Sequence, residues 1–95
     1  MSKHLTIEDF EPFIGKEFAV ARRSDVLRLV SADRGRVSPS LTRIPFSLIF
    51  EGPRNRIVPE GLYRLAAEGG ADFELYVIPI MTASDDRQDY EVVFN

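Results

Sequence analysis

Hydrophobic and polar residues alternate over short runs from residue 17 to the end of the chain, and Gly, Pro, Ser or Asp bounds the runs. Successive side chains of a β-strand point to opposite faces, so this alternation predicts strands that bury one face. The run of residues 44–51 is the clearest case. We predict six strands, over residues 17–22, 25–32, 44–51, 61–66, 73–81 and 90–95.

The apolar residues at alternate strand positions form the predicted core. They are Phe18, Val20, Leu27, Leu29, Ile44, Phe46, Leu48, Phe50, Tyr63, Leu65, Tyr90, Val92 and Phe94. The strand over residues 73–81 differs, because it is apolar on both faces between Tyr76 and Ile80. Such strands are typical of central or doubly covered positions in a sheet, so we expect that position here.

A short helical turn is predicted before the first strand. Thr6 is followed three residues later by Asp9, which approximates a capping box. Ile7 and Phe10 then fall on one side of the turn, so we expect it to lie on the body of the domain as a lid.

The connections between the predicted strands are too short to hold crossover helices, so neighbouring strands should be antiparallel. The predicted fold is therefore all-β: a small antiparallel six-stranded meander that forms a barrel or a two-layer sandwich, with one short N-terminal helical turn. At 95 residues the chain holds one domain. We assign residues 1–95 to it, with the turn at about 5–14 and the β meander at 17–95.

The composition excludes several kinds of functional site. The chain has no cysteine, which excludes disulfides, thiolate metal sites and thiol nucleophiles. No apolar run approaches the roughly 18 residues of a membrane span, and no signal-peptide core follows the first residues. We therefore expect a cytoplasmic protein without a membrane partner.

No group of residues supports an enzyme, so we assign no catalytic, cofactor-binding or metal-binding residue and expect no cofactor. The single histidine, His4, lies near the N-terminus, and no serine has a nucleophile-elbow context. Asp85, Asp86 and Asp89 lack the glycine and terminal glutamate of a calcium loop. A carboxylate-only glycosidase is the weakest hypothesis, because no spacing forces two carboxylates together.

The charge distribution is uneven. Residues 22–64 hold nine Arg and four acids, whereas residues 65–95 hold one Arg and seven acids. Arginine binds carboxylates and phosphates with a planar, two-pronged donor, so the arginines are the candidate interface or anion-binding residues. They are Arg28, Arg34, Arg36, Arg43, Arg54, Arg56 and Arg64.

Two interpretations of these arginines stay open. In the first, they form surface ion pairs with the acidic C-terminal part, and each pair stabilises the fold by about 0–1 kcal/mol. In the second, they contact an acidic protein partner or a second copy of the chain. A nucleic-acid partner is disfavoured, because the two arginine-bearing loops leave opposite ends of the strand at 44–51. The alternative function is binding of an anionic ligand, either an oligonucleotide or an acidic polysaccharide.

Four segments carry a family resemblance: Leu5-Thr-Ile-Glu-Asp-Phe-Glu-Pro-Phe-Ile-Gly15, Pro45-Phe-Ser-Leu-Ile-Phe-Glu-Gly-Pro53, Gly61-Leu-Tyr-Arg-Leu65 and Tyr90-Glu-Val-Val-Phe-Asn95. With these segments the chain resembles a family of small bacterial domains of unknown function. The resemblance implies a short all-β domain, no assigned catalytic residues and gene neighbourhoods that encode phage-tail-collar-like proteins. The leading hypothesis is therefore a non-enzymatic interaction or assembly module, as a phage-tail-like structural accessory.

Overall fold

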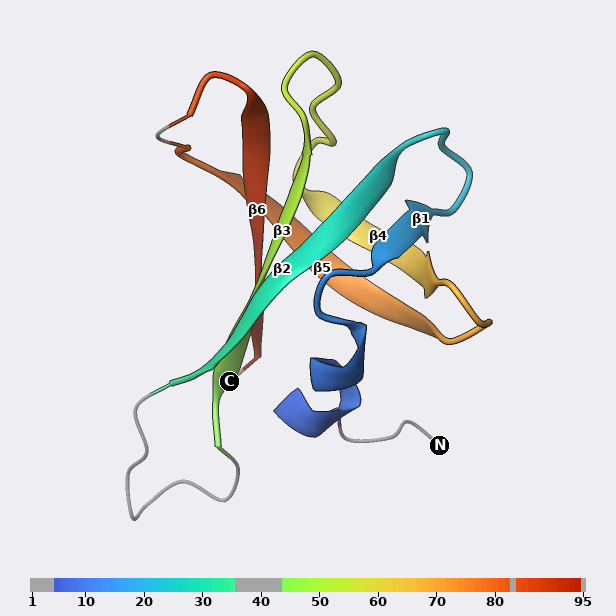
Figure 1. The fold of residues 1–95 in the computed structure, drawn as a ribbon, viewed down its shortest axis with the longest axis vertical. Helices are drawn as coiled ribbons and strands as arrows, with labels where there is room; N and C mark the ends of the chain where they lie inside the picture. Colours follow the sequence, from blue (N-terminus) through green and yellow to red (C-terminus); the bar gives the residue numbers. More distant parts are fainter. Residues whose placement is uncertain (1–4, 36–43, 83, 95) are drawn as a thin grey trace.

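A computed structural model describes residues 5–35, 44–82 and 84–94. Two short 3-10 turns, η1 (Ile7–Asp9) and η2 (Glu11–Phe13), precede six strands that close into one barrel (Figure 1). The strands are β1 (Glu17–Val20), β2 (Val26–Arg34), β3 (Phe46–Pro53), β4 (Gly61–Ala67), β5 (Asp72–Ile80) and β6 (Arg87–Phe94). The predicted all-β antiparallel fold is confirmed, and of the two predicted architectures the structure has the barrel.

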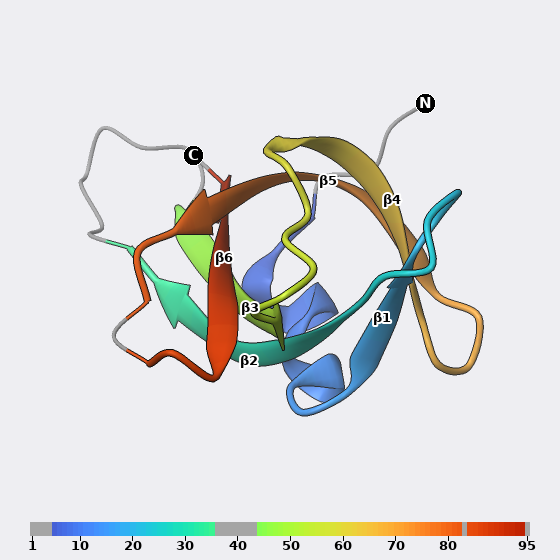
Figure 2. The ribbon, with the colours of Figure 1, turned by 90° about the horizontal axis from the view of Figure 1, so that it is seen from above.

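The strand order around the barrel is β1-β2-β3-β6-β5-β4, and every neighbouring pair is antiparallel. The predicted single six-stranded meander is therefore wrong, because β3 pairs with β6 and not with β4. The chain forms two three-stranded meanders, β1–β3 and β4–β6, that join along the β3–β6 and β4–β1 pairs. Residues 54–60 carry the chain from β3 across one end of the barrel to β4 (Figure 2). We call residues 54–60 the crossing segment.

The inward face of the barrel matches the predicted alternation for most strands. Phe18, Val20, Leu27, Leu29, Phe46, Leu48, Phe50, Leu65, Tyr90 and Val92 are all buried. Tyr63 and Phe94 are half-buried and pack against this core. Ile44 is a wrong core prediction: β3 begins only at Phe46, and Ile44 is 52% exposed.

The expectation that the fifth strand is doubly covered is also wrong. In β5, Leu75 and Val77 are buried, whereas Tyr76 between them is 49% exposed. A closed barrel has a single sheet whose outer face meets solvent, so an apolar run in a strand does not require a second covering layer.

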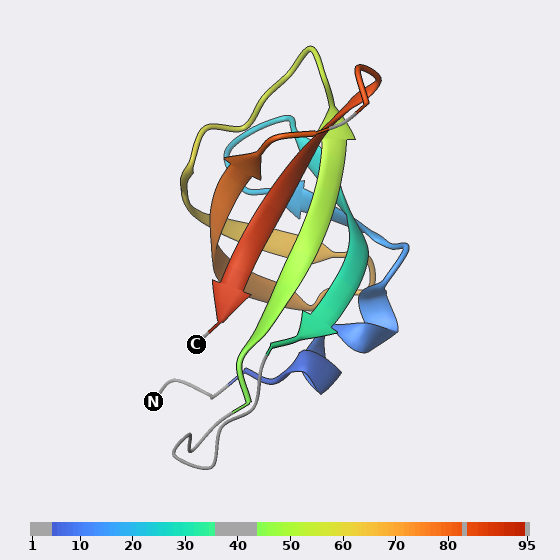
Figure 3. The same cartoon turned by 90° about the vertical axis from the view of Figure 1, so that its left-hand side faces the viewer.

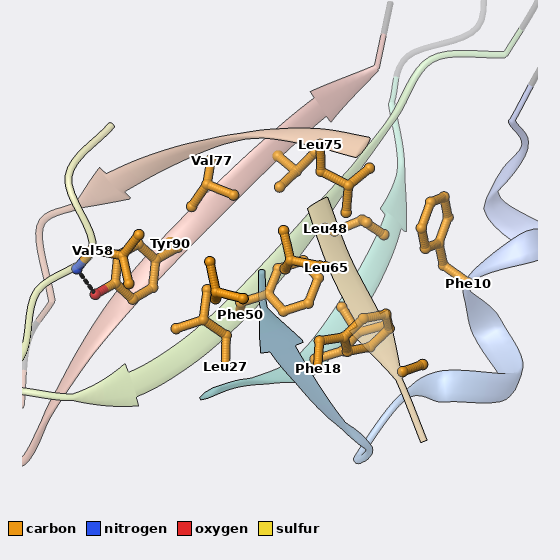
Figure 4. Close-up of a cluster of buried hydrophobic side chains, with 14 of the residues drawn as sticks. Phe10, Phe18, Leu27, Leu48, Phe50, Val58, Leu65, Leu75, Val77 and Tyr90 are labelled. Carbon is orange, nitrogen blue, oxygen red and sulfur yellow. Dashed lines mark hydrogen bonds between the residues drawn. The ribbon is translucent and has the colours of Figure 1, made fainter. Parts of the chain in front are cut away.

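Side chains close both ends of the barrel (Figure 4). At one end, Phe10 from the η1–η2 turn is fully buried and its ring lies 4.6 Å from that of Phe73 and 5.5 Å from that of Phe94. At the other end, the crossing segment buries Val58 completely. The predicted lid is therefore confirmed, and the crossing segment is a second one.

The N-terminal turn has the predicted cap. The backbone N–H of Thr6 donates to the Asp9 carboxylate at 2.8 Å, which holds the first turn. Among the described residues, the structure contains no helix with the length and apolar character needed to cross a membrane.

Candidate functional site

The crossing segment is the part of the fold where polar side chains from the most elements meet. Asp25, at the start of β2, has a side chain only 3% exposed. Its carboxylate accepts a hydrogen bond from Arg56 Nε at 3.0 Å and another from Arg23 Nε. Arg56 also donates to the Ser24 hydroxyl at 3.0 Å, so this arginine ties the crossing segment to the β1–β2 turn.

The hydrogen bond from Arg56 is the largest influence on Asp25, and it lowers the pKa of this carboxyl below its ordinary value of 3.8. Burial acts in the opposite direction, and the charges of both arginines support the lowering. Asp25 is therefore a charged anchor at neutral pH and has no proton to donate to a reaction.

Three tyrosine hydroxyls fix the remainder of the crossing segment. Tyr90 is fully buried, and its hydroxyl accepts a hydrogen bond from the backbone N–H of Val58 at 2.9 Å (Figure 4). Burial raises the pKa of Tyr90. The hydroxyl of Tyr63 donates to the Pro59 carbonyl at 2.6 Å, and that of Tyr76 donates to the Glu60 carboxylate at 2.6 Å. Each of the three hydroxyls thus holds the crossing segment to a different strand, Tyr63 from β4, Tyr76 from β5 and Tyr90 from β6.

A second polar group lies on the outside of the barrel, across β2, β3 and β6. Glu51 contacts Arg28 on one side and Arg87 at 3.7 Å on the other, and Arg87 also pairs with Asp89 at 2.9 Å. An open hollow of about 390 Å³ lies here, lined by Glu17, Val26, Arg28, Glu51, Gly52, Pro53, Asp86 and Arg87. Because carboxylates already neutralise both arginines, the hollow is not a preformed anion site.

The other candidate arginines that the structure describes do not converge. Arg34 pairs with Glu8 at 2.6 Å beside the helical turn, and Arg64 pairs with Asp72 at 3.1 Å across β4 and β5. Arg54, at the opposite end of β3 from Arg34, donates to the Gln88 amide oxygen at 3.1 Å. Arg36 and Arg43 lie outside the described residues, as do His4, Ser38 and Ser40.

Asp85 and Asp86 lie in the loop before β6, whereas Asp89 lies within β6 itself. Asp89 is paired with Arg87, and the backbone N–H of Asp86 donates to the Ser84 hydroxyl at 3.1 Å. Over residues 5–35, 44–82 and 84–94, no three His, Asp or Glu side chains come close enough together to hold a metal ion.

Among the residues that the structure describes, most ion pairs use acids from the first two thirds of the chain, whereas the surface-pair interpretation placed them with the acidic C-terminal part. In the described structure, Glu68, Glu74, Asp85, Asp86 and Glu91 have no ion pair. Of the described cations, Lys16, Arg22 and Arg54 have no carboxylate partner. Uncompensated charge of both signs therefore remains on the surface.

The sequence did not identify Asp25, Gln88 and Val58 as residues at the end of the barrel that the crossing segment closes. Gln88 is buried, and its amide nitrogen donates to the Ile80 carbonyl at 2.7 Å. Asp25 and Gln88 look like ordinary polar residues at strand starts, and only the contacts between distant segments distinguish them. The one signal in the sequence is the polar cluster of Arg23, Ser24 and Asp25 in a turn.

The fold and this geometry can be set beside other proteins. No curated protein and no solved structure matches the chain. A family model described as "Domain of unknown function (DUF6916)" matches residues 5–94, nearly the whole length. The predicted resemblance to a family of small domains of unknown function is thereby confirmed, and the chain belongs to the DUF6916 family.

Proposed function

We propose that the protein is a non-enzymatic interaction or assembly module that makes its contacts with the outside of the barrel. The observation that carries the proposal is that, among the described residues, charged side chains of both signs without an ion pair lie on the barrel surface, while apolar side chains pack its interior and both ends. A filled barrel leaves no room inside for a substrate, so the outer surface is the part that can recognise another molecule.

The buried polar groups support the same proposal. Each described buried side-chain nitrogen or oxygen has a hydrogen-bond partner within the chain. The pKa of Asp25 is lowered by arginine and that of Tyr90 is raised by burial, so neither group titrates near neutral pH. Groups fixed in this way stabilise a scaffold and are poor general acids or bases.

The alternative of an anionic ligand receives less support from the same contacts. Arg28, Arg34, Arg56 and Arg64 each already contact a carboxylate, which a phosphate or sulfate would have to displace. The gene neighbourhoods that the resemblance implies, with phage-tail-collar-like genes, would fit an accessory of a larger protein assembly, and we include that role in the proposal.

Light scattering on a sizing column, at about 50 mM and about 500 mM salt, tests the proposal together with tagged purification from the native host. We expect either a mass above the 10.8 kDa monomer at low salt or one stoichiometric protein partner. A protein that is monomeric at both salt concentrations and purifies without a stoichiometric partner would overturn the proposal.

A further inference from the structure

The outer face of β3, β6 and β5 contains an apolar row with one carboxylate at its centre. Glu91 lies directly opposite Ile49 of β3 on one side and Ile78 of β5 on the other. Val93, the next outward residue of β6, is 47% exposed. The three strands lie side by side in Figure 3, which looks onto this side of the barrel. We call Ile49, Ile78, Glu91 and Val93 the acidic face.

Glu91 is an unusual surface charge. It is half-buried between two isoleucines, and within the described residues it has no ion pair and no side-chain hydrogen bond. A carboxylate in apolar surroundings loses part of its hydration, and a cation brought to it offsets that cost. The acidic face therefore suits a surface that combines an apolar side chain with positive charge.

The chain carries such a surface at the end closed by the crossing segment. Ile57 is 48% exposed there, and within the described structure Arg54 of the same segment has no carboxylate partner. Arg23 and Arg56 share the single carboxylate of Asp25, which leaves one positive charge in excess.

The adjoining β1–β2 turn adds Arg22, which is exposed and has no partner in the described structure. The turn is joined to the crossing segment through the hydrogen bonds of Arg56 to Ser24 and Asp25. We call Arg22, Arg23, Arg54, Arg56 and Ile57 the basic end.

Resting on the proposed function, we propose that the basic end of one copy docks on the acidic face of a second copy. The two surfaces match in kind: each combines one exposed aliphatic side chain, Val93 on the acidic face and Ile57 on the basic end, with charge, and the signs are opposite. Because the surfaces differ, the contact is head-to-tail, and repetition of it generates a ring or an open stack. A symmetric contact of two acidic faces would instead bring like charges together.

Charge reversal on each surface tests the proposal. The variants are E91R for the acidic face and R22E/R54E for the basic end, since none of these side chains has an ion pair to lose among the described residues. The controls are E68R and K16E, which make the same changes of sign at exposed residues outside both surfaces. Circular dichroism and the thermal midpoint establish that every variant is folded before its mass is measured.

We expect the wild type to assemble at low salt and each reversal to weaken the association about tenfold or more, whereas the controls assemble like the wild type. An equimolar mixture of E91R and R22E/R54E should recover the assembly. In the mixture, the arginine introduced on the acidic face of one variant meets the two glutamates introduced on the basic end of the other. The other contact in the mixture, between the basic end of E91R and the acidic face of R22E/R54E, retains the wild-type charges. Recovery in the mixture separates a docking contact from a folding defect.

Two results would overturn this docking while leaving the proposed function intact. One is an assembly whose mass neither reversal changes. The other is a wild type that stays monomeric at about 1 mM but purifies with a different protein partner. A monomer without any partner would overturn both proposals.

Discussion

Asp25 is a buried charge at the end of the barrel that the crossing segment closes. Replacing it in D25N removes the charge that two arginines share in a buried position, so we expect a loss of about 2 kcal/mol of unfolding free energy at neutral pH. Urea unfolding of both proteins measures the difference. D72N, which alters an exposed pair with Arg64, is the control and should lose less than about 1 kcal/mol.

The pH dependence of that difference follows from the direction of the pKa shift. The pKa of Asp25 is lower in the folded protein than its ordinary value of 3.8, so the unfolded chain takes up the proton first as the pH falls. The difference in unfolding free energy between the wild type and D25N should be constant well above pH 3.8 and shrink as the pH falls below it. An advantage that increases below this pH would contradict the assignment.

Tyr90 makes a different kind of contribution, because its hydroxyl is the acceptor for a buried backbone group. In Y90F the N–H of Val58 is left without a partner, and we expect a loss of about 1–3 kcal/mol by chemical denaturation. Y63F removes a more exposed hydroxyl bond to the crossing segment and should cost less. Equal losses in the two variants would show that burial of the Val58 N–H does not determine the cost.

At the level of elements, the N-terminal turns pack on the barrel through Ile7, Phe10 and Phe13, and Phe10 is the most deeply buried of the three. Phe10 is fully buried and contacts Phe46, Phe73 and Phe94, so F10A should lose about 3–5 kcal/mol of unfolding free energy. I14A, in the same segment but 43% exposed, should lose less than about 1 kcal/mol. Similar midpoints for the two variants in urea would exclude Phe10 as the anchor.

The strands could be predicted because each carries its own pattern. Alternation in β1, β2, β3 and β6 reports burial directly, since one face of every barrel strand is inward. The pattern misled where apolar residues lie outside the core: Ile44 precedes its strand, and Tyr76 is outward in β5. Ile49 and Ile78 look like core residues in the sequence for the same reason, although both lie beside Glu91 on the outer face of the barrel.

At the level of the whole molecule, the barrel depends on pairs of strands that are distant in the sequence. Phe46 of β3 lies opposite Phe94 of β6, and Phe18 of β1 lies opposite Ala67 of β4. Local patterns carry no information about such partners, so neither the strand order nor the placement of Asp25 against Arg56 could be predicted. Of the arginines in or beside the two loops, Arg34 and Arg54 lie at opposite ends of β3, whereas Arg36 and Arg43 lie outside the described residues.

The same distant pairing predicts slow folding. Loop closure must precede the β3–β6 and β1–β4 contacts, so refolding should take milliseconds to seconds. Stopped-flow dilution from urea, followed by tyrosine fluorescence or far-ultraviolet circular dichroism, measures the rate. A refolding phase complete within microseconds would show that local contacts dominate the transition state.

The arrangement of the barrel as two meanders also determines how copies could exchange parts of the chain. When the β3–β6 and β1–β4 pairs open, each half presents two strand edges that fit only the other half. The crossing segment is the sole link between the halves, so extension of this link would let β4–β6 of one molecule complete β1–β3 of another. Two hydrogen bonds hold the crossing segment on the barrel, from Arg56 to Asp25 and from the Val58 N–H to the Tyr90 hydroxyl, so they also favour closure within one chain over domain swapping between two.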